Sequence, residues 1–239
     1  PPVEREVQSG ADGRFRLEAL TPGEEWSAID EAEFLVDVTP ASAENLRISE
    51  VHYNPGAPTD AEVAAGFDDK DEFEFLEFVN ISQQTIDLAN VRLAQTVVDG
   101  QTQGLAFDFS TGAVSQLNPG DRVLVVENAA AFGLRYGDGL PVAGQWSGGL
   151  SNNSETITVM AGDDLLQAFT YDDAWHPATD GTGPSLEHID VTNDDLSVWS
   201  QSTSWRPSSV DGGSPGTSAE VDVPGDSNRD GVFDSSDLV

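Results

Sequence analysis

The stretch EFEFLEFVNI, residues 72–81, decides the fold class. Glu alternates with Phe at its start, and this period of two is typical of a strand with one face in the core. We therefore expect Glu72 and Glu74 to lie on the solvated face. The alternation breaks at the adjacent apolar residues Phe75 and Leu76, which predicts a β-bulge there.

Short apolar runs of the same kind recur along the chain between turns rich in Gly, Pro, Asn and Asp, which predicts an all-β protein. The clearest strand candidates are LRISEVHYNP (46–55), LNPGDRVLVVEN (117–128), ETITVMAG (155–162) and LLQAFTYDD (165–173). A turn at Gly162 and Asp163 joins the last two. Helices are expected only at Ala61–Ala65 and in AAAFGLRYG (129–137). This spacing of strands and turns favours an Ig-like β-sandwich.

The charge balance limits the possible partners. The 239 residues include 43 acidic and 10 basic side chains, and the formal net charge is −33. Nucleic acid and anionic membranes are excluded as partners, because both are bound by Lys and Arg. The acidity fits a saline or calcium-rich medium. The chain has no Cys, and it has no apolar run near the roughly 20 residues of a membrane span, so we expect no membrane insertion.

Residues 1–40 are predicted to be a partial β element. GRFRLEAL (13–20) and AEFLVDV (32–38) read as two strands, which are too few for a core. Residues 16–36 are similar to the last strands of the fibronectin-like domain found at the C-terminus of chitobiase-type proteins. That resemblance rests on Trp26, Ser27, Ala28, Glu31, Ala32 and Phe34. It implies that this element ends an upstream domain.

Residues 41–220 carry an ordered series of motifs that resembles the lamin-tail domain. The series is LRISEVHYNP, EFEFLEFVNISQQTIDLANVRL, LNPGDRVLVVEN, GLSNNSETITVM, FTYDDAWHPATDGTGPSLEHID and SWRPSSVDGGSPG. Asn90 and Val91 replace the Gly and Trp that the family usually has. The resemblance implies an Ig-like sandwich that serves adhesion or assembly rather than catalysis. In bacteria such domains belong to exported or cell-surface multidomain proteins, so we expect an extracellular location.

Residues 221–239 contain the spacing of an EF-type calcium loop. The oxygen ligands are expected from Asp226, Asn228, Asp230, Asp234 and Asp237, with the backbone carbonyl of Val232 and a Gly at the sixth position. The stretch resembles one dockerin repeat, which also uses Asp at the last position. It implies a calcium cofactor and an anchoring role towards a protein partner or a cell-surface scaffold. We expect the repeat to be truncated.

The acidic residues near position 70 allow more than one interpretation. Paired carboxylates such as Glu72, Glu74 and Glu77 can hydrolyse glycosidic bonds when they face a cleft, but a solvated strand face is the expected role. A structural hydrogen bond is expected for Glu77. The run DDKDE (68–72) could bind a second calcium ion, although a flexible acidic loop fits it better because no Gly-centred ligand spacing is present.

No catalytic residue is predicted. His52, His176 and His188 are well separated and are expected to be structural, and no GxSxG or P-loop motif occurs. Trp146, Trp175, Trp199 and Trp205 are expected in the core, with sugar stacking as the alternative. Two alternatives to an assembly module therefore stay open. One is a part of a polysaccharide-degrading enzyme whose catalytic domain lies upstream, and the other is a carbohydrate-binding module.

Overall fold

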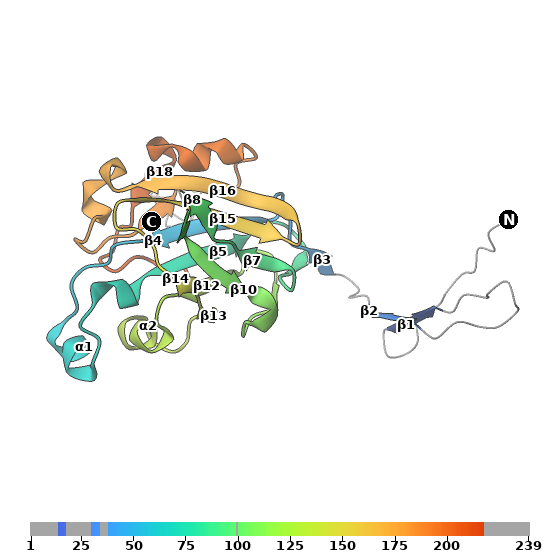
Figure 1. The fold of residues 1–239 in the computed structure, drawn as a ribbon, viewed down its shortest axis with the longest axis horizontal. Coiled ribbons are helices and arrows are strands. Elements are labelled where there is room, and N and C mark those ends of the chain that lie inside the picture. The colour runs from blue at the N-terminus through green and yellow to red at the C-terminus, as the bar shows by residue number, and fades with distance from the viewer. Residues whose placement is uncertain (1–13, 18–29, 34–37, 99, 218–239) are drawn as a thin grey trace, which may run out of the picture. The chain divides into compact units, whose positions relative to one another are not determined.

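The computed structural model describes residues 14–17, 30–33, 38–98 and 100–217 (Figure 1). The chain divides into two compact units, Pro1–Thr39 and Pro40–Val239. In the first unit, β1 (Arg14–Leu17) pairs antiparallel with β2 (Asp30–Glu33). The second of these strands starts earlier than the sequence indicates, and residues 34–37 of the predicted strand lie outside the described residues. The proposed division at residues 40 and 220 stays a prediction, since its last part lies outside the described residues.

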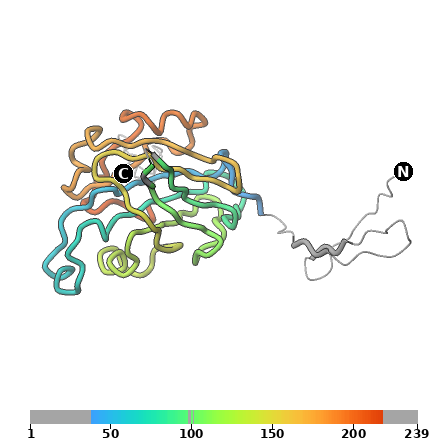
Figure 2. Tube along the Cα trace, viewed as in Figure 1, coloured from blue at the N-terminus to red at the C-terminus, as the bar shows by residue number. Residues whose placement is uncertain are grey.

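Two sheets form a β-sandwich in the second unit, and Figure 2 follows the chain through them. The six-stranded sheet has the order β13 (Val142–Gln145), β12 (Arg122–Val126), β5 (Phe75–Asn80), β4 (Leu46–His52), β17 (Leu186–His188) and β18 (Trp205–Pro207). The five-stranded sheet has the order β14 (Ser147–Gly148), β10 (Leu105–Asp108), β7 (Val91–Leu93), β15 (Ser154–Ala161) and β16 (Asp164–Asp172). The all-β, Ig-like fold class is confirmed.

Two small sheets complete the strands that the structure describes. One contains β11 (Gln116–Leu117), β6 (Thr85–Asp87) and β3 (Val38–Pro40), and the other contains β8 (Thr96–Val98) and β9 (Gln101–Gln103). The helices are α1 (Asp60–Ala65) and α2 (Ala129–Tyr136), both as predicted. Short 3-10 turns are η1 (Lys70–Phe73), η2 (Phe109–Thr111), η3 (Asp173–Trp175), η4 (Pro177–Thr179), η5 (Leu196–Ser200) and η6 (Ser202–Ser204).

The main hydrophobic core lies between the two large sheets. It contains Trp199 and Trp205, both buried, with Phe169 stacked on Trp205 at 5.3 Å between ring centroids. A second, smaller cluster joins Phe132 of α2 to Phe75 of β5, together with two side chains of β12. Helix α2 therefore covers part of the outer face of the six-stranded sheet.

This second cluster corrects the prediction for residues 72–81. Strand β5 begins only at Phe75, all six of its residues are buried, and Glu74 is 1% exposed. The half-buried strand with a solvated glutamate face is wrong, because α2 packs on Phe75, Gly216 covers Glu77 and the backbone of Leu150 lies against Glu74. The expected bulge is also misplaced, since the register shifts in the partner strand β4, between Ile48 and Glu50.

Candidate functional site: a glutamate row beneath the closing segment

Three glutamates lie side by side across the six-stranded sheet. Glu77 of β5 is directly paired with Glu50 of β4, and Glu50 is directly paired with Glu187 of β17. Each of the three is at most 3% exposed. We call Glu50, Glu77 and Glu187 the glutamate row. Like charges at paired positions repel one another, so the row needs donors and positive charges close by.

Residues 213–217, which we call the closing segment, cover the row and donate to it. The backbone N–H of Ser214 donates to Glu50 Oε1 at 2.8 Å, and the N–H of Gly216 donates to Glu77 Oε2 at 2.5 Å. The Ser214 hydroxyl donates to Glu187 Oε1 at 2.6 Å and lies 3.2 Å from Glu50 Oε2. The segment is therefore attached to three strands at once.

The close approach depends on a glycine. Gly213 has φ of +88°, a left-handed conformation that side chains rarely adopt. A Cβ added there would lie 2.5 Å from Glu50 Oε1 and 3.0 Å from both Phe75 and Ser185. Gly213 of the GGSPG motif (212–216) thus lets the backbone approach the carboxylates closely.

The three carboxyl groups are neutralised in different ways. Arg122 forms an ion pair with Glu77, and Arg206 Nε lies 3.2 Å from Glu187 Oε2. Glu50 pairs with neither arginine. Burial, followed by the charge of Glu77, raises the pKa of Glu50 from 4.5 to about 8, although hydrogen bonds from Ser185 and Ser214 act in the opposite direction. Burial also raises the pKa of Glu77.

A cavity of about 250 Å³ adjoins the glutamate row and is lined in part by His188 and residues 189–192. Convergent carboxylates beside a cavity are the arrangement that a glycosidase needs. Here, however, every oxygen of the row has a protein partner: Ser49, Arg122 and Gly216 bind Glu77; Ser185 and Ser214 bind Glu50; Ser214 and Arg206 bind Glu187. The glutamate row therefore binds the closing segment and holds it against the sheet.

The structure places the other sequence candidates as follows. His52 and His188 are buried, and His176 Nε2 lies 3.0 Å from the carbonyl oxygen of Ser202. Glu77 forms the predicted structural hydrogen bond, with the Ser49 hydroxyl at 2.7 Å from its Oε1. Glu72 and Glu74 are not part of the glutamate row. The predicted calcium ligands Asp226, Asn228, Asp230, Val232, Asp234 and Asp237 lie outside the described residues.

The tryptophans confirm the core prediction in three of four cases. Trp146, Trp199 and Trp205 are buried, and Trp175 is partly buried against the same core. Glu50 and Glu187 are the site residues that sequence reasoning missed. Their signal was a Glu within an apolar run, in ISEVH and SLEHI, where a solvated side chain would interrupt the core.

A comparison with protein families gives one match, to the lamin tail domain, over residues 39–173. The chain belongs to the lamin tail domain family. The match ends before β17 and β18, yet these strands complete the six-stranded sheet, and β17 carries Glu187. Neither a curated protein nor a solved structure matches the chain.

Two absences hold for the described part of this lamin tail domain protein. None of its helices there is both long and apolar enough to cross a bilayer. Within the same residues, no three His, Asp or Glu side chains converge as a ready-made metal site.

Proposed function

We propose that this lamin tail domain protein is a non-catalytic binding or assembly module of an exported multidomain protein. The sandwich is a rigid support, and the loop of residues 226–237 binds calcium and anchors the protein to a protein partner or a cell-surface scaffold. Calcium neutralises Asp226, Asp230, Asp234 and Asp237, which would otherwise repel one another, and so orders the loop.

One observation carries the proposal: three buried glutamates all serve to hold the closing segment. Ser214 and Gly216 are attached to buried glutamates of the sheet, so the last described residues of the sandwich are anchored. An attachment of this kind suits a domain that connects an anchoring loop to the rest of the protein. An acid–base pair would need a carboxylate oxygen open to a substrate.

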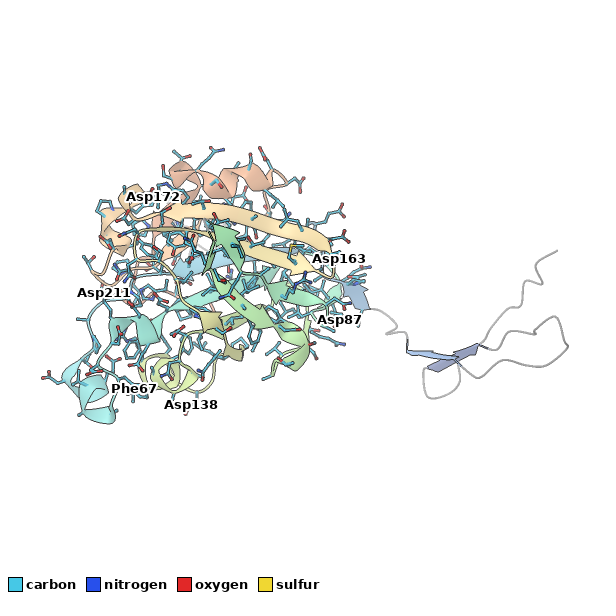
Figure 3. All side chains as sticks on the ribbon, viewed as in Figure 1. Phe67, Asp87, Asp138, Asp163, Asp172 and Asp211 are labelled. Atoms are coloured by element: carbon cyan, nitrogen blue, oxygen red, sulfur yellow. The ribbon has the colours of Figure 1, made fainter. Side chains whose placement is uncertain are left out.

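Calcium titration by calorimetry tests the loop. The chain is compared with D226A/D230A and with D138A/D163A, a control that removes two exposed aspartates of the sandwich, both labelled in Figure 3. We expect D226A/D230A to lose a binding step that the control keeps. Identical isotherms for all three proteins would contradict calcium binding by the loop.

Retention on insoluble polysaccharide tests the carbohydrate-binding alternative. That alternative requires exposed tryptophans, whereas Trp146, Trp199 and Trp205 are buried. We expect the chain to pass through chitin and cellulose columns with and without calcium. Specific retention that soluble sugar reverses would favour a carbohydrate-binding module over an anchoring module.

A further inference from the structure

A second group of carboxyl side chains lies where three connections meet at one end of the sandwich. Glu74 stands between η1 and β5, Glu127 follows β12, and Asn152 lies between β14 and β15. The backbone N–H of Glu127 donates to the carbonyl of Glu74 at 3.1 Å. Asn152 Nδ2 donates to Asp71 Oδ1 at 3.4 Å, and the N–H of Leu150 donates to the Glu74 carboxyl. These contacts place Glu74, Glu127 and Asn152 on adjoining connections.

This group differs from the glutamate row in one respect. Glu74 Oε1, Glu127 Oε2 and Asn152 Oδ1 are all buried and have no hydrogen-bond partner. Glu74 as a whole is 1% exposed. Buried acceptors in folded proteins nearly always have a donor, so unpaired oxygens on three adjoining connections indicate a missing positively charged ligand.

The neighbouring donors leave Glu74 Oε1 unpaired, and Trp146 Nε1, which faces the Glu127 carboxyl, is itself buried without a hydrogen-bond partner. Lys70 Nζ contacts the Asn54 side chain and lies 3.5 Å from Asp71 Oδ1, so it pairs with Asp71 and leaves Glu74 Oε1 without a partner. The indole N–H of Trp146 faces the Glu127 carboxyl and lowers its pKa, while burial, the larger effect, raises it. Asp69, Asp71 and Glu72 add negative charge around Glu127.

We propose that Glu74, Glu127 and Asn152 bind a divalent cation, and that the cation is Ca²⁺. All three contribute oxygen, and Ca²⁺ takes six to eight oxygen ligands from carboxylates, amides, carbonyls and water in a flexible arrangement. Mg²⁺ requires a near-ideal octahedron, which three side chains from separate connections do not preform. Two carboxylates and one amide make up the set, and water would complete it.

This site differs from the one considered for the run DDKDE. The run is part of an ordered turn: Asp69 caps η1, Asp71 contacts Lys70 and Asn152, and Glu72 accepts from Asn128 at 3.0 Å. The flexible acidic loop expected there is therefore wrong. The unpaired oxygens lie just after the run, and they are independent of the calcium loop proposed for residues 226–237.

A proton is the alternative occupant. Without a bound ion, burial and the charge of Asp71 raise the pKa of Glu74 to about 10, so a carboxylic acid could donate to one of the unpaired oxygens. The two occupants can be distinguished by experiment, because a protonated site would not bind calcium.

The test uses the full chain with D226A/D230A, which removes the tail ligands, and adds E74Q/E127Q to that background. Calorimetry with CaCl₂ is expected to show one binding step in D226A/D230A and none after E74Q/E127Q. At a calcium concentration 100 times the Kd, the melting temperature of D226A/D230A is expected to rise by about 5–10 °C. The matched control E44Q/D163N removes two exposed carboxylates and should keep both effects.

Glutamine preserves the shape of both side chains and removes the need for a cation, so E74Q/E127Q is expected to fold. Its melting temperature in EDTA reports folding, and its calcium response reports the site. Absence of calcium binding by D226A/D230A at millimolar CaCl₂ would overturn the proposal and assign the site to a proton. Binding that survives E74Q/E127Q would also overturn it. Neither result bears on the tail loop, which the comparison of D226A/D230A with the unmodified chain tests separately.

Discussion

Glu50 and Glu77 occupy directly paired positions on β4 and β5, with both side chains buried. The two carboxyl groups can lie side by side because their charges are compensated in different ways. Glu77 forms an ion pair with Arg122, whereas Glu50 has no arginine partner and burial raises its pKa to about 8. Both then accept backbone N–H groups from the closing segment, at Ser214 and Gly216. The pair therefore joins the end of the sandwich to its central strands.

The substitution Glu50→Gln is expected to change the pH dependence of stability. The pKa of Glu50 is about 8 in the folded protein against 4.5 for the ordinary group, so the folded state retains the proton longer. Its stabilising contribution is fully present below pH 4.5 and is lost as the pH rises to about 8. Between pH 5 and pH 8 the stability of E50Q should therefore increase relative to the unmodified chain, by up to about 4 kcal/mol.

Urea denaturation of both proteins at pH 5, 6, 7 and 8 measures this difference. The variant E44Q, at an exposed position, serves as the control and should follow the unmodified chain. Parallel pH profiles for E50Q and the unmodified chain would show that Glu50 is already ionised in the folded protein.

The substitution Gly213→Ala is expected to loosen the closing segment. A methyl group there meets Glu50 Oε1 at 2.5 Å in addition to the strain at φ of +88°. Gly120 is the matched control, because it has φ of +78° and no atom within 4 Å of an added Cβ. We expect G120A to cost about 1 kcal/mol and G213A about 2–4 kcal/mol, measured by chemical denaturation. Equal losses would mean that the contact with Glu50 contributes nothing beyond the backbone strain.

The substitution Arg135→Lys is expected to weaken the attachment of α1 to α2. Arg135 Nε and one terminal nitrogen lie 2.8 and 2.9 Å from the two oxygens of Glu62, and its guanidinium stacks 3.4 Å from the ring centroid of Phe73. Lysine keeps the charge but loses the fork and the stack, so R135K should cost about 1–2 kcal/mol.

This loss should itself depend on pH. The bonds from Arg135 lower the pKa of Glu62 from 4.5 to about 2, so its contribution is present above pH 4.5 and disappears as the pH falls towards 2. Denaturation at pH 7 and pH 3 should therefore show a smaller R135K effect at the lower value. Arg92→Lys, on the central strand β7 of the five-stranded sheet, is the control. An R135K effect that is constant over this range would exclude the Glu62 ion pair as its source.

The substitution Trp199→Phe is expected to destabilise the core more than Trp175→Phe. Trp199 is fully buried, its Nε1–H donates to the carbonyl of Ile48 at 3.0 Å, and His188 stacks on it at 3.7 Å. The variant loses volume and leaves that carbonyl without its indole donor, at a cost of about 2–4 kcal/mol. Trp175 is only partly buried, so W175F should cost less than half as much in the same denaturation experiment. Similar losses at both positions would place the two tryptophans in equivalent environments.

The sequence by itself determined the features that depend on neighbours along the chain. Alternation and turn residues predicted the hairpin of β15 and β16 with its turn at Gly162. The run AAAFGLRYG predicted α2, and the ordered motifs predicted the lamin tail domain. These signals are local because hydrogen-bonding period and turn geometry are set within a few residues.

Only the tertiary structure decided what covers each face. The alternation in EFEFLEFVNI predicts a strand with one apolar and one polar face. It does not show that α2 packs on Phe75 or that the closing segment covers Glu77. Glu74 reads as solvated in the sequence, yet it is buried with an unpaired oxygen. Glu50 and Glu187 lie 137 residues apart and become neighbours only when β17 adds to β4. Burial of a carboxylate depends on segments remote in sequence, so no local pattern records it.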